Sequence, residues 1–171
     1  MRWNMSKKNL LILGVEQYGH VVKETAEATG CFGSIAFLDD NNPAAIGKLL
    51  NCRRLRQEYD CAFVAMGNSR LRRHWLRSLK AEGFALPVRV HPKAYISPSA
   101  VLREGTIAET MAVVNTGAVV EAGGLLCAGC VVNHNARVSC GCQIDCNAVV
   151  AASAIVPEGT KVPAGTVFEK Q

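Results

Sequence analysis

Residues 91–168 fall into thirteen rows of six: HPKAYI, SPSAVL, REGTIA, ETMAVV, NTGAVV, EAGGLL, CAGCVV, NHNARV, SCGCQI, DCNAVV, AASAIV, PEGTKV and PAGTVF. The sixth column holds Ile, Leu or Val in eleven rows, and the fourth column holds a small residue in all thirteen. The third column is Gly in seven rows and Asn in two. A fixed period that never slips indicates a solenoid, in which each repeat is stable only when it stacks on its neighbours.

Each column predicts where its side chain points. The large sixth column and the small fourth column are expected to point inward and fill a narrow core. The third column falls at a corner, where glycine, and next best asparagine, adopts positive φ. This column chemistry resembles the left-handed parallel β-helix, in which three hexapeptides make one triangular coil and thirteen make about four coils. The left hand comes from the resemblance, because crossovers between parallel strands are otherwise right-handed.

The first half of the chain alternates strand-like and helix-like segments. An apolar run over residues 9–15 predicts a buried strand, and residues 17–29 follow as a helix that Gly30 ends. Residues 35–38 and 61–66 predict two further strands. This alternation favours a small parallel α/β domain of the Rossmann-like kind.

A second helix is expected to begin at Asn68 or Ser69 and to run to Glu82. Its apolar side is predicted from an i, i+4, i+8 spacing, and it consists of Leu71, Trp75 and Leu79. Its basic residues are expected to form a solvated face, and they are Arg70, Arg72, Arg73, Arg77 and Lys80.

The sequence therefore predicts two domains. Residues 1–88 form the Rossmann-like domain and residues 89–171 form the β-helix, with a hinge from Pro87 to Pro92. Residues 1–90 carry 14 Lys and Arg against 8 Asp and Glu, whereas residues 91–171 carry 5 against 6. Any anionic partner is therefore expected to meet the first half, although no nucleic-acid motif accompanies the basic residues.

The composition favours a soluble cytoplasmic protein. Charged residues make up 19% of the 171 residues, and no run approaches the ~18 apolar residues that a membrane span needs. The apolar run near the start is too short for the core of a signal peptide. The eight cysteines are therefore expected to be reduced. Cys130 and Cys142 fall in the inward fourth column, so no metal is expected despite a C-x-x-C spacing.

Four segments carry a further resemblance: LLILGVEQYG (10–19), FLDDN (37–41), AMGNSR (65–70) and HPKAYISPSAVL (91–102). With the two-domain order, they resemble the sialic acid O-acetyltransferases and nucleotide-amino-sugar N-acetyltransferases. The resemblance implies acetyl transfer from acetyl-CoA to a sugar amine or hydroxyl, without a metal, at a site between the subunits of a homotrimer. It also implies that the first domain binds the nucleotide sugar through Gly14, Gln17, Tyr18, Asp39, Asp40, Gly67 and Asn68.

The chain departs from the family pattern in its first loop. That loop usually reads Gly-x-Gly-Gly-His-Gly, and here it runs from Gly14 to Gly19 as GVEQYG, with Glu16 and Gln17 in place of two glycines. Glycines let a phosphate approach the backbone and a helix N-terminus, whereas Glu16 adds negative charge there. A further family histidine falls on Gln143.

The family's catalytic histidine lies in a segment such as Asp-His-Asp-Cys. An ungapped count of rows places that segment on residues 133–136, with His134 as the base and Asn135 where the family has a carboxylate. A neutral imidazole can accept a proton from an attacking amine or hydroxyl near neutral pH. Asn135 either orients the imidazole or serves as a positive-φ corner residue. A rival alignment, through NTGA one coil earlier, would put Ala122 in the histidine's place, but it disturbs the domain junction.

The remaining expectations concern the co-substrate and the assembly. By the family's spacing, acetyl-CoA is expected near Ala151 and Ala152, and the amide of Ala152 is the candidate oxyanion donor. An acyl-enzyme through Cys140 or Cys146 is the competing chemistry, and a catalytically inactive or regulatory paralogue is the competing function. The trimer contact is expected to use the apolar fifth column, namely Val113, Val119, Leu125, Val131 and Val149.

Overall fold

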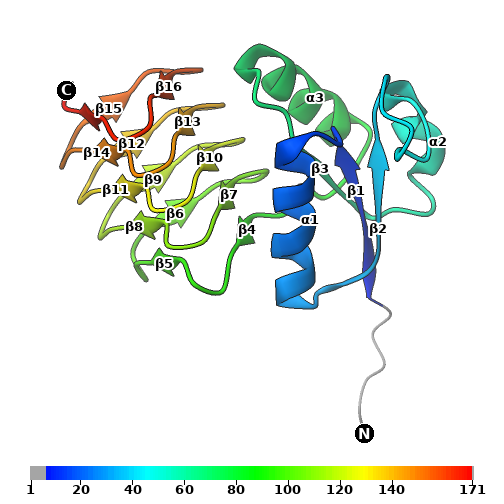
Figure 1. Cartoon of the computed structure of the whole chain (residues 1–171), viewed down its shortest axis with the longest axis horizontal. Coiled ribbons are helices and arrows are strands. Elements are labelled where there is room, and N and C mark those ends of the chain that lie inside the picture. Colours follow the sequence, from blue (N-terminus) through cyan, green and yellow to red (C-terminus); the bar gives the residue numbers. More distant parts are fainter. Residues whose placement is uncertain (1–6, 171) are drawn as a thin grey trace, which may run out of the picture.

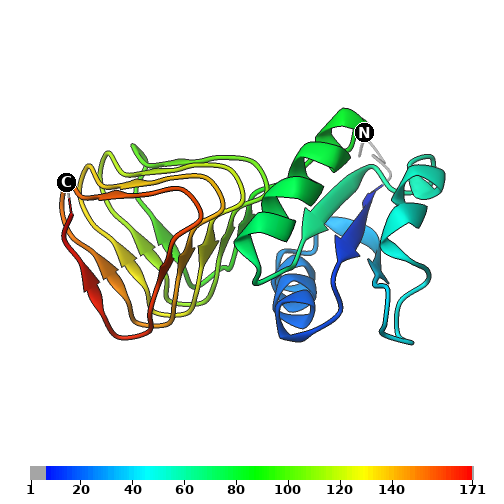
Figure 2. The same ribbon diagram turned by 90° about the horizontal axis from the view of Figure 1, so that it is seen from above.

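The computed structural model describes residues 7–170, so residues 1–6 of the predicted first domain and residue 171 lie outside the described residues. An α/β unit lies beside a stack of triangular coils (Figure 1). Helices separate the sheet of the α/β unit from the coils (Figure 2). This arrangement confirms the predicted fold class, a small Rossmann-like unit followed by a left-handed parallel β-helix.

Three parallel strands form the sheet of the α/β unit. They are β1 (Lys8–Leu13), β2 (Phe32–Leu38) and β3 (Cys61–Val64), in the order β2-β1-β3. The central strand β1 is covered on both faces, so Leu10 to Leu13 are fully buried. Both faces must therefore be apolar, which explains why the strand reads as a continuous apolar run. All three predicted strands are confirmed, although β2 begins earlier than predicted.

Two long helices follow β1 and β3. Helix α1 (Gln17–Thr29) ends at Gly30, whose φ of 61° supplies the left-handed cap. Helix α3 (Ser69–Ala81) begins at Asn68, whose side chain accepts a hydrogen bond from Leu71 N at 3.0 Å. Both bounds match the prediction closely. The sequence analysis did not predict the 3₁₀ turn η1 (Leu49–Asn51) and the short helix α2 (Cys52–Leu55).

The predicted buried side of α3 is wrong in part. Leu71 is 50% exposed, whereas Arg72 is fully buried. Arg72, Leu76 and Leu79 form the buried side of the helix, so Arg72 does not belong to a solvated basic face. On α1, Thr25 and Ala26 are buried and define its packed side.

The β-helix has three faces of stacked two-residue strands. The first face contains β4 (Arg89–Val90), β7 (Ile107–Ala108), β10 (Leu125–Leu126), β13 (Gln143–Ile144) and β16 (Lys161–Val162). The second face contains β5 (Tyr95–Ile96), β8 (Val113–Val114), β11 (Val131–Val132), β14 (Val149–Val150) and β17 (Val167–Phe168). The third face contains β6 (Val101–Leu102), β9 (Val119–Val120), β12 (Arg137–Val138) and β15 (Ile155–Val156). We call the turns after the first, second and third faces the first, second and third corners.

The column prediction is confirmed by burial and by backbone angle. Sixth-column residues from Val114 to Val162 are at most 2% exposed, and Ala112, Ala136 and Ala148 of the fourth column are fully buried. The seven third-column glycines and both asparagines have positive φ. Met111 and Ser153 also have positive φ, at 59° and 61°, which shows that the corner geometry holds even where the residue does not favour it.

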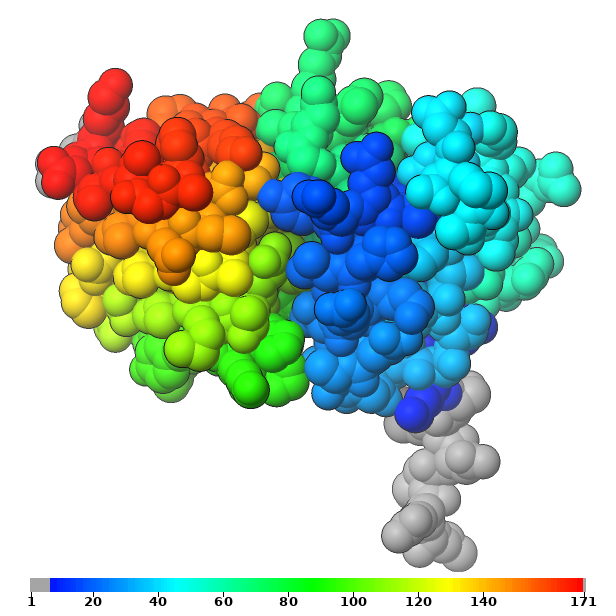
Figure 3. All heavy atoms as spheres, in the orientation of Figure 1, coloured from blue at the N-terminus to red at the C-terminus, as the bar shows by residue number. Residues whose placement is uncertain are grey.

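The α/β unit packs on the first face and on the third corner. Val22 and Ala26 of α1 share a buried cluster with Ile107 and Leu125 of the first face. Leu125 is therefore buried within the chain, and its predicted place in a trimer contact is wrong. The two parts touch along their length on the face that Figure 3 shows. None of the helices within residues 7–170 has the length and apolarity to cross a membrane.

Helix α3 lies along the third corner, one coil after another. A Cβ at Gly105 or Gly123 would stand 2.5 or 2.4 Å from a terminal methyl of Leu76. A Cβ at Gly141 would stand 2.6 Å from the side chain of Arg73. Real Cβ atoms do not approach so closely, so the corner glycines serve the helix contact as well as the turn.

The buried guanidinium of Arg72 joins the two parts. Its Nε and Nη2 donate to the carbonyls of Gly123 and Gly141 in the β-helix at 2.9 and 2.6 Å. Its Nη1 donates to the carbonyls of Met66 and Gly67, after β3, at 2.5 and 3.0 Å. Burial lowers the pKa of Arg72 to about 10. Only a planar fork of donors can serve carbonyls on both sides at once.

Replacing Arg72 with lysine is therefore expected to destabilise the protein although the charge is kept. A single ammonium cannot reach both sets of carbonyls, and buried carbonyls without a donor cost about 1–3 kcal/mol each. We expect Arg72→Lys to lower the free energy of unfolding by about 3 kcal/mol in urea titrations. Arg70→Lys, on the exposed side of the same helix, is the matched control and should leave it unchanged. Equal stabilities for the two variants would contradict the role assigned to Arg72.

Candidate active site

A pocket of about 730 Å³ opens at the carboxyl ends of β1 and β3. We call it the α/β pocket, and it is lined by Gly14, Glu16, Gln17, Tyr18, Asp39, Ala65, Met66, Gly67, Asn68 and Leu71. Every substrate-binding residue predicted from the sequence, except Asp40, lies in this set. Ligands of parallel α/β folds usually bind at this end of the sheet, where helices begin.

Glycines shape the wall of the α/β pocket. Gly14 has a φ of 102°, and a Cβ there would stand 2.8 Å from the carbonyl oxygen of Ala65. A Cβ at Gly19 would stand 2.3 Å from the carbonyl oxygen of Gly14. The turn between β1 and α1 therefore packs directly on neighbouring backbone, which leaves the space in front of both helix N-termini open.

The first turns of α1 and α3 both border the α/β pocket through Gln17 and Asn68. The first amides of a helix have no partner within the helix, and they attract anions. The lining contains no lysine or arginine, and it contains the carboxylate of Glu16. A phosphate group in this pocket would therefore be held by backbone amides instead of basic side chains.

Asp39 closes the loop beside the α/β pocket. Its carboxylate accepts hydrogen bonds from the backbone amides of Asn41, Asn42 and Val15, at 2.9, 3.1 and 3.1 Å. The amide of Asn41, followed by those of Val15 and Asn42, holds the pKa of Asp39 below its usual value. Asp40 lies apart from this pocket, where its Oδ1 accepts from Leu49 N at 3.0 Å.

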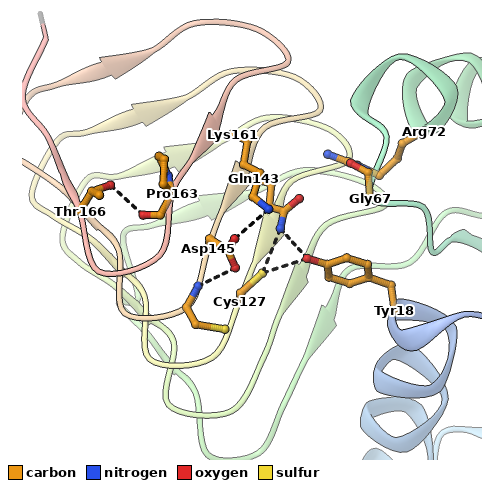
Figure 4. Close-up of polar contacts among 10 residues, drawn as sticks. Tyr18, Gly67, Arg72, Cys127, Gln143, Asp145, Lys161, Pro163 and Thr166 are labelled. Atoms are coloured by element: carbon orange, nitrogen blue, oxygen red, sulfur yellow. Dashed lines mark hydrogen bonds and ion pairs between the residues drawn. The ribbon is translucent and has the colours of Figure 1, made fainter.

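Tyr18 connects the α/β pocket to the β-helix. Its ring reaches from the first turn of α1 to the first corner, where its hydroxyl meets Gln143 and Cys127 (Figure 4). Asp145 lies on the same corner and is paired with Lys161 at 2.9 Å. That ion pair and a hydrogen bond from the amide of Cys146 lower the pKa of Asp145. The pocket therefore ends against a polar part of the β-helix.

His134 lies on the second corner, which neither α1 nor α3 covers. It is exposed, and its backbone amide donates to Asn133 Oδ1 at 2.9 Å. In the next coil Ser153 N donates to the carbonyl of His134 at 2.8 Å, and Ala151 N donates to Phe168 at 2.9 Å. The amide of Ala152 stands between these two. The structure therefore brings His134, Ala151 and Ala152 together, at a different corner from the α/β pocket.

Asn135 has the geometry of a corner residue. Its φ is 55°, and a Cβ on Gly117, one coil earlier, would stand 2.3 Å from its Oδ1. The side chain therefore packs over the neighbouring corner. Asn133 is the asparagine that touches the histidine backbone, and Asn115 Nδ2 donates to it at 3.3 Å. Asn133 was not among the predicted site residues.

The position of the rival alignment lies in a different environment. Ala122 belongs to the third corner, where the next residue, Gly123, is covered by Leu76 and bonded to Arg72. Cys140 is partly buried at the same corner, whereas Cys146 is exposed and Cys130 is fully buried in the core. Within residues 7–170 no three His, Cys, Asp or Glu side chains gather as metal ligands would.

Arg72, which was not predicted as a functional residue, donates to the carbonyls of Met66 and Gly67 in the pocket loop. The spacing of Arg72 could have predicted its burial, because it precedes Leu76 and Leu79 by four and seven residues and so lies on the same side of the helix. A charged residue in that series is easily read as surface, since the carbonyls that receive it come from distant parts of the chain.

Comparisons with known proteins agree with this architecture. The family model described as the PglD N-terminal domain matches residues 9–79. No significant match was found among curated proteins. The solved acetyltransferase domain of PglB from Neisseria gonorrhoeae is 32% identical, with 96% of this chain and 83% of that chain covered and a TM-score of 0.92.

Two further structures were solved with ligands. The same PglB domain in complex with acetyl coenzyme A is 32% identical, covers 97% of this chain and 84% of that chain, and has a TM-score of 0.90. PerB from Caulobacter crescentus, in complex with CoA and GDP-perosamine, is 25% identical, covers 94% of this chain and 91% of that chain, and has a TM-score of 0.62. With its α/β pocket and hexapeptide β-helix, the chain is an acyltransferase that belongs to the nucleotide-amino-sugar N-acetyltransferase family.

Proposed function

We propose that the protein transfers the acetyl group of acetyl-CoA to an amine or hydroxyl of a nucleotide-linked sugar. The observation that carries the proposal is the α/β pocket, where two helix N-termini border a cavity of about 730 Å³ that ends against the β-helix. Backbone amides would hold the diphosphate, and the sugar would extend towards Tyr18 and the first corner. The relatives solved with acetyl coenzyme A, or with CoA and GDP-perosamine, support both substrates.

The second face supports assembly into a homotrimer. Its outward residues form an apolar stripe down the coils, namely Tyr95, Val113, Val131, Val149 and Val167. Tyr95 and Val167 are 56% and 57% exposed in the single chain. A continuous apolar stripe on a rigid surface favours contact with another subunit. Val113, Val131 and Val149 therefore remain in the proposed contact, and Val119 lies on the third face.

Assembly also accounts for the separation of the two halves of the site. The α/β pocket lies beside the first corner, whereas His134 lies on the second corner of the same chain. In the proposed trimer the second corner of one protomer lies against the α/β pocket of its neighbour. His134 would then complete the neighbour's site, with the acetyl thioester held near Ala151 and Ala152.

His134 is the proposed general base. Its imidazole accepts the proton of the acceptor amine or hydroxyl while the nitrogen or oxygen forms a bond to the thioester carbonyl carbon. The Ala152 amide donates to the oxyanion that forms. The carbon–sulfur bond then breaks, and the leaving thiolate of CoA receives the proton from the imidazolium. The amine or hydroxyl is a poor nucleophile while it keeps its proton. A general base that removes this proton typically raises the rate by ~10²–10⁴-fold.

Two alternatives differ from this scheme in what they require. An acyl-enzyme would need an activated thiolate. Cys140 has no hydrogen-bonded base among the contacts of the described residues, and Cys146 meets only the Asp145 carboxylate, which is paired with Lys161 and has a lowered pKa, so it is a weak base. A regulatory paralogue would keep the scaffold without the chemistry. Calorimetric titration with acetyl-CoA and with UDP-sugars tests the enzyme, because absence of binding to both would end the catalytic proposal.

His134→Ala is expected to lower kcat at least ~10²-fold with little change in the KM for acetyl-CoA, because the base acts in the transition state. Cys140→Ala and Cys146→Ala should leave the rate nearly unchanged. His74→Ala, an exposed histidine on α3, is the matched control. Turnover is measured by release of the CoA thiol over a panel of amino-sugar nucleotides and sialic acids. A fully active His134→Ala variant would sink the proposed mechanism.

Val131→Asp is expected to convert the trimer to monomers, since it places a charge in the middle of the apolar stripe. Ile155→Asp, at a 48% exposed site on the third face, is the control and should remain trimeric. Light scattering at micromolar concentration reads the mass directly. A wild-type monomer, or a Val131→Asp trimer, would argue against the second face as the contact.

Mixed oligomers test whether two protomers build one site. Gly67→Trp fills the α/β pocket but leaves His134 intact, whereas His134→Ala does the reverse. Each variant alone should be inactive. A site then needs a pocket from one protomer and a histidine from the next, so equal co-expression restores about a quarter of the activity. Absence of any recovery in a confirmed mixed trimer would place both halves in one chain.

A further inference from the structure

The Tyr18 hydroxyl stands where the α/β pocket meets the β-helix. Tyr18 lines the pocket, and its ring lies 3.4 Å from the place where a Cβ on Gly67 would stand. Its hydroxyl contacts Gln143 of the first face and Cys127 of the first corner (Figure 4). The residue therefore touches both the space for the substrate and the wall of the β-helix.

The O–H hydrogen of Tyr18 has no strong acceptor among the described residues and can donate to a ligand. Gln143 Nε2 donates to Tyr18 Oη at 2.5 Å. The other polar contact of the hydroxyl among residues 7–170 is Cys127 Sγ, at 3.7 Å, and sulfur is a weak acceptor. Burial raises the pKa of Cys127 to about 12, so this sulfur remains a neutral thiol. The phenol is therefore a donor that has no strong acceptor within the described chain.

Gln143 limits the directions in which the Tyr18 hydroxyl can donate. Its side chain is only 4% exposed, and its amide also lies 3.9 Å from Cys127 Sγ. Because Gln143 occupies a lone pair of the phenol oxygen, the hydrogen must point elsewhere, towards the sulfur or towards the pocket. Both members of this contact are uncharged side chains.

We propose that Tyr18 donates a hydrogen bond to an oxygen of the acceptor sugar and that Gln143 is its positioning residue. The pair then selects sugars that present a hydroxyl or ether oxygen at this point and disfavours those that present an ammonium group, which has no lone pair to offer. This inference rests on the proposed function, because it assigns the sugar end of the same pocket.

Binding measurements separate the sugar contact from the nucleotide contact. Calorimetry on the full-length protein compares GDP with GDP-perosamine, and UDP with UDP-N-acetylglucosamine, as probes. The ratio of the two dissociation constants within a pair reports the contribution of the sugar alone. We expect Tyr18→Phe to reduce that ratio about five- to tenfold, the loss of one hydrogen bond, while the nucleotide binds as before. Tyr59→Phe, a buried tyrosine of the α/β core, is the matched control.

Variants of Gln143 test its positioning role. Gln143→Leu should reduce the sugar ratio, and Gln143→His, which keeps an N–H donor, should restore it. The double variant Tyr18→Phe, Gln143→Leu should be no worse than Tyr18→Phe alone, because both changes remove one contact. A purely structural role would instead weaken nucleotide and nucleotide sugar alike, and that result would overturn the proposal.

Two other outcomes have distinct meanings. A wild-type protein that prefers the nucleotide sugar, and a Tyr18→Phe variant with the same preference, would overturn this inference and leave the proposed function standing. A wild-type protein that binds none of the four probes would overturn the proposed function, and the sugar contact with it.

Discussion

The narrow core of the β-helix is the constraint on which the rest of the molecule depends. Each coil admits one large and one small inward side chain per face, and from Gly105 onward every third-column corner residue has positive φ. Cys130 and Cys142 satisfy the small position as buried thiols, and Met111 accepts a strained corner because its neighbours above and below fix the turn. A rigid prism results, and its corners offer fixed positions to whatever packs against them.

Much of this fold could be read from the sequence because its determinants are local. A row of six residues carries its own core positions and its own corner, so the columns predicted the strands, the buried residues and the turns. The end of helix α1 could be predicted for the same reason, because the capping residue Gly30 directly follows its last residue, Thr29. The packed side of α3 could not be predicted in this way, because two of the carbonyls that Arg72 binds belong to Gly123 and Gly141, which lie 51 and 69 residues away.

In the candidate site, too, some residues could be predicted from local sequence and others depend on contacts between distant parts of the chain. The residues of the α/β pocket follow strands that the sequence identified, and the family resemblance implied a binding role for Gly14, Tyr18 and Gly67 there. Asp40 lies outside the α/β pocket, where its carboxylate accepts a hydrogen bond from Leu49 N in a turn that has no strong sequence signal. Tyr18 and Gln143 are 125 residues apart in the sequence, so no local sequence pattern could predict their contact. His134 was proposed by counting rows, and in the proposed trimer a second chain would complete its surroundings.

The contact between α3 and the third corner has a geometric consequence. One turn of an α-helix rises ~5.4 Å, and stacked strands lie ~4.8 Å apart, so three turns of α3 can span several consecutive coils. Leu76 lies over the coils of Gly105 and Gly123, whereas Arg73 and Ser69 lie over those of Gly141 and Gly159. Helix α3 therefore fixes which coils lie opposite each of its side chains. An extra 18-residue coil inserted between Gly105 and Gly159 would keep the β-helix but shift the corner glycines away from Leu76, Arg73 and Ser69. Coils added after Phe168 would leave these contacts unchanged.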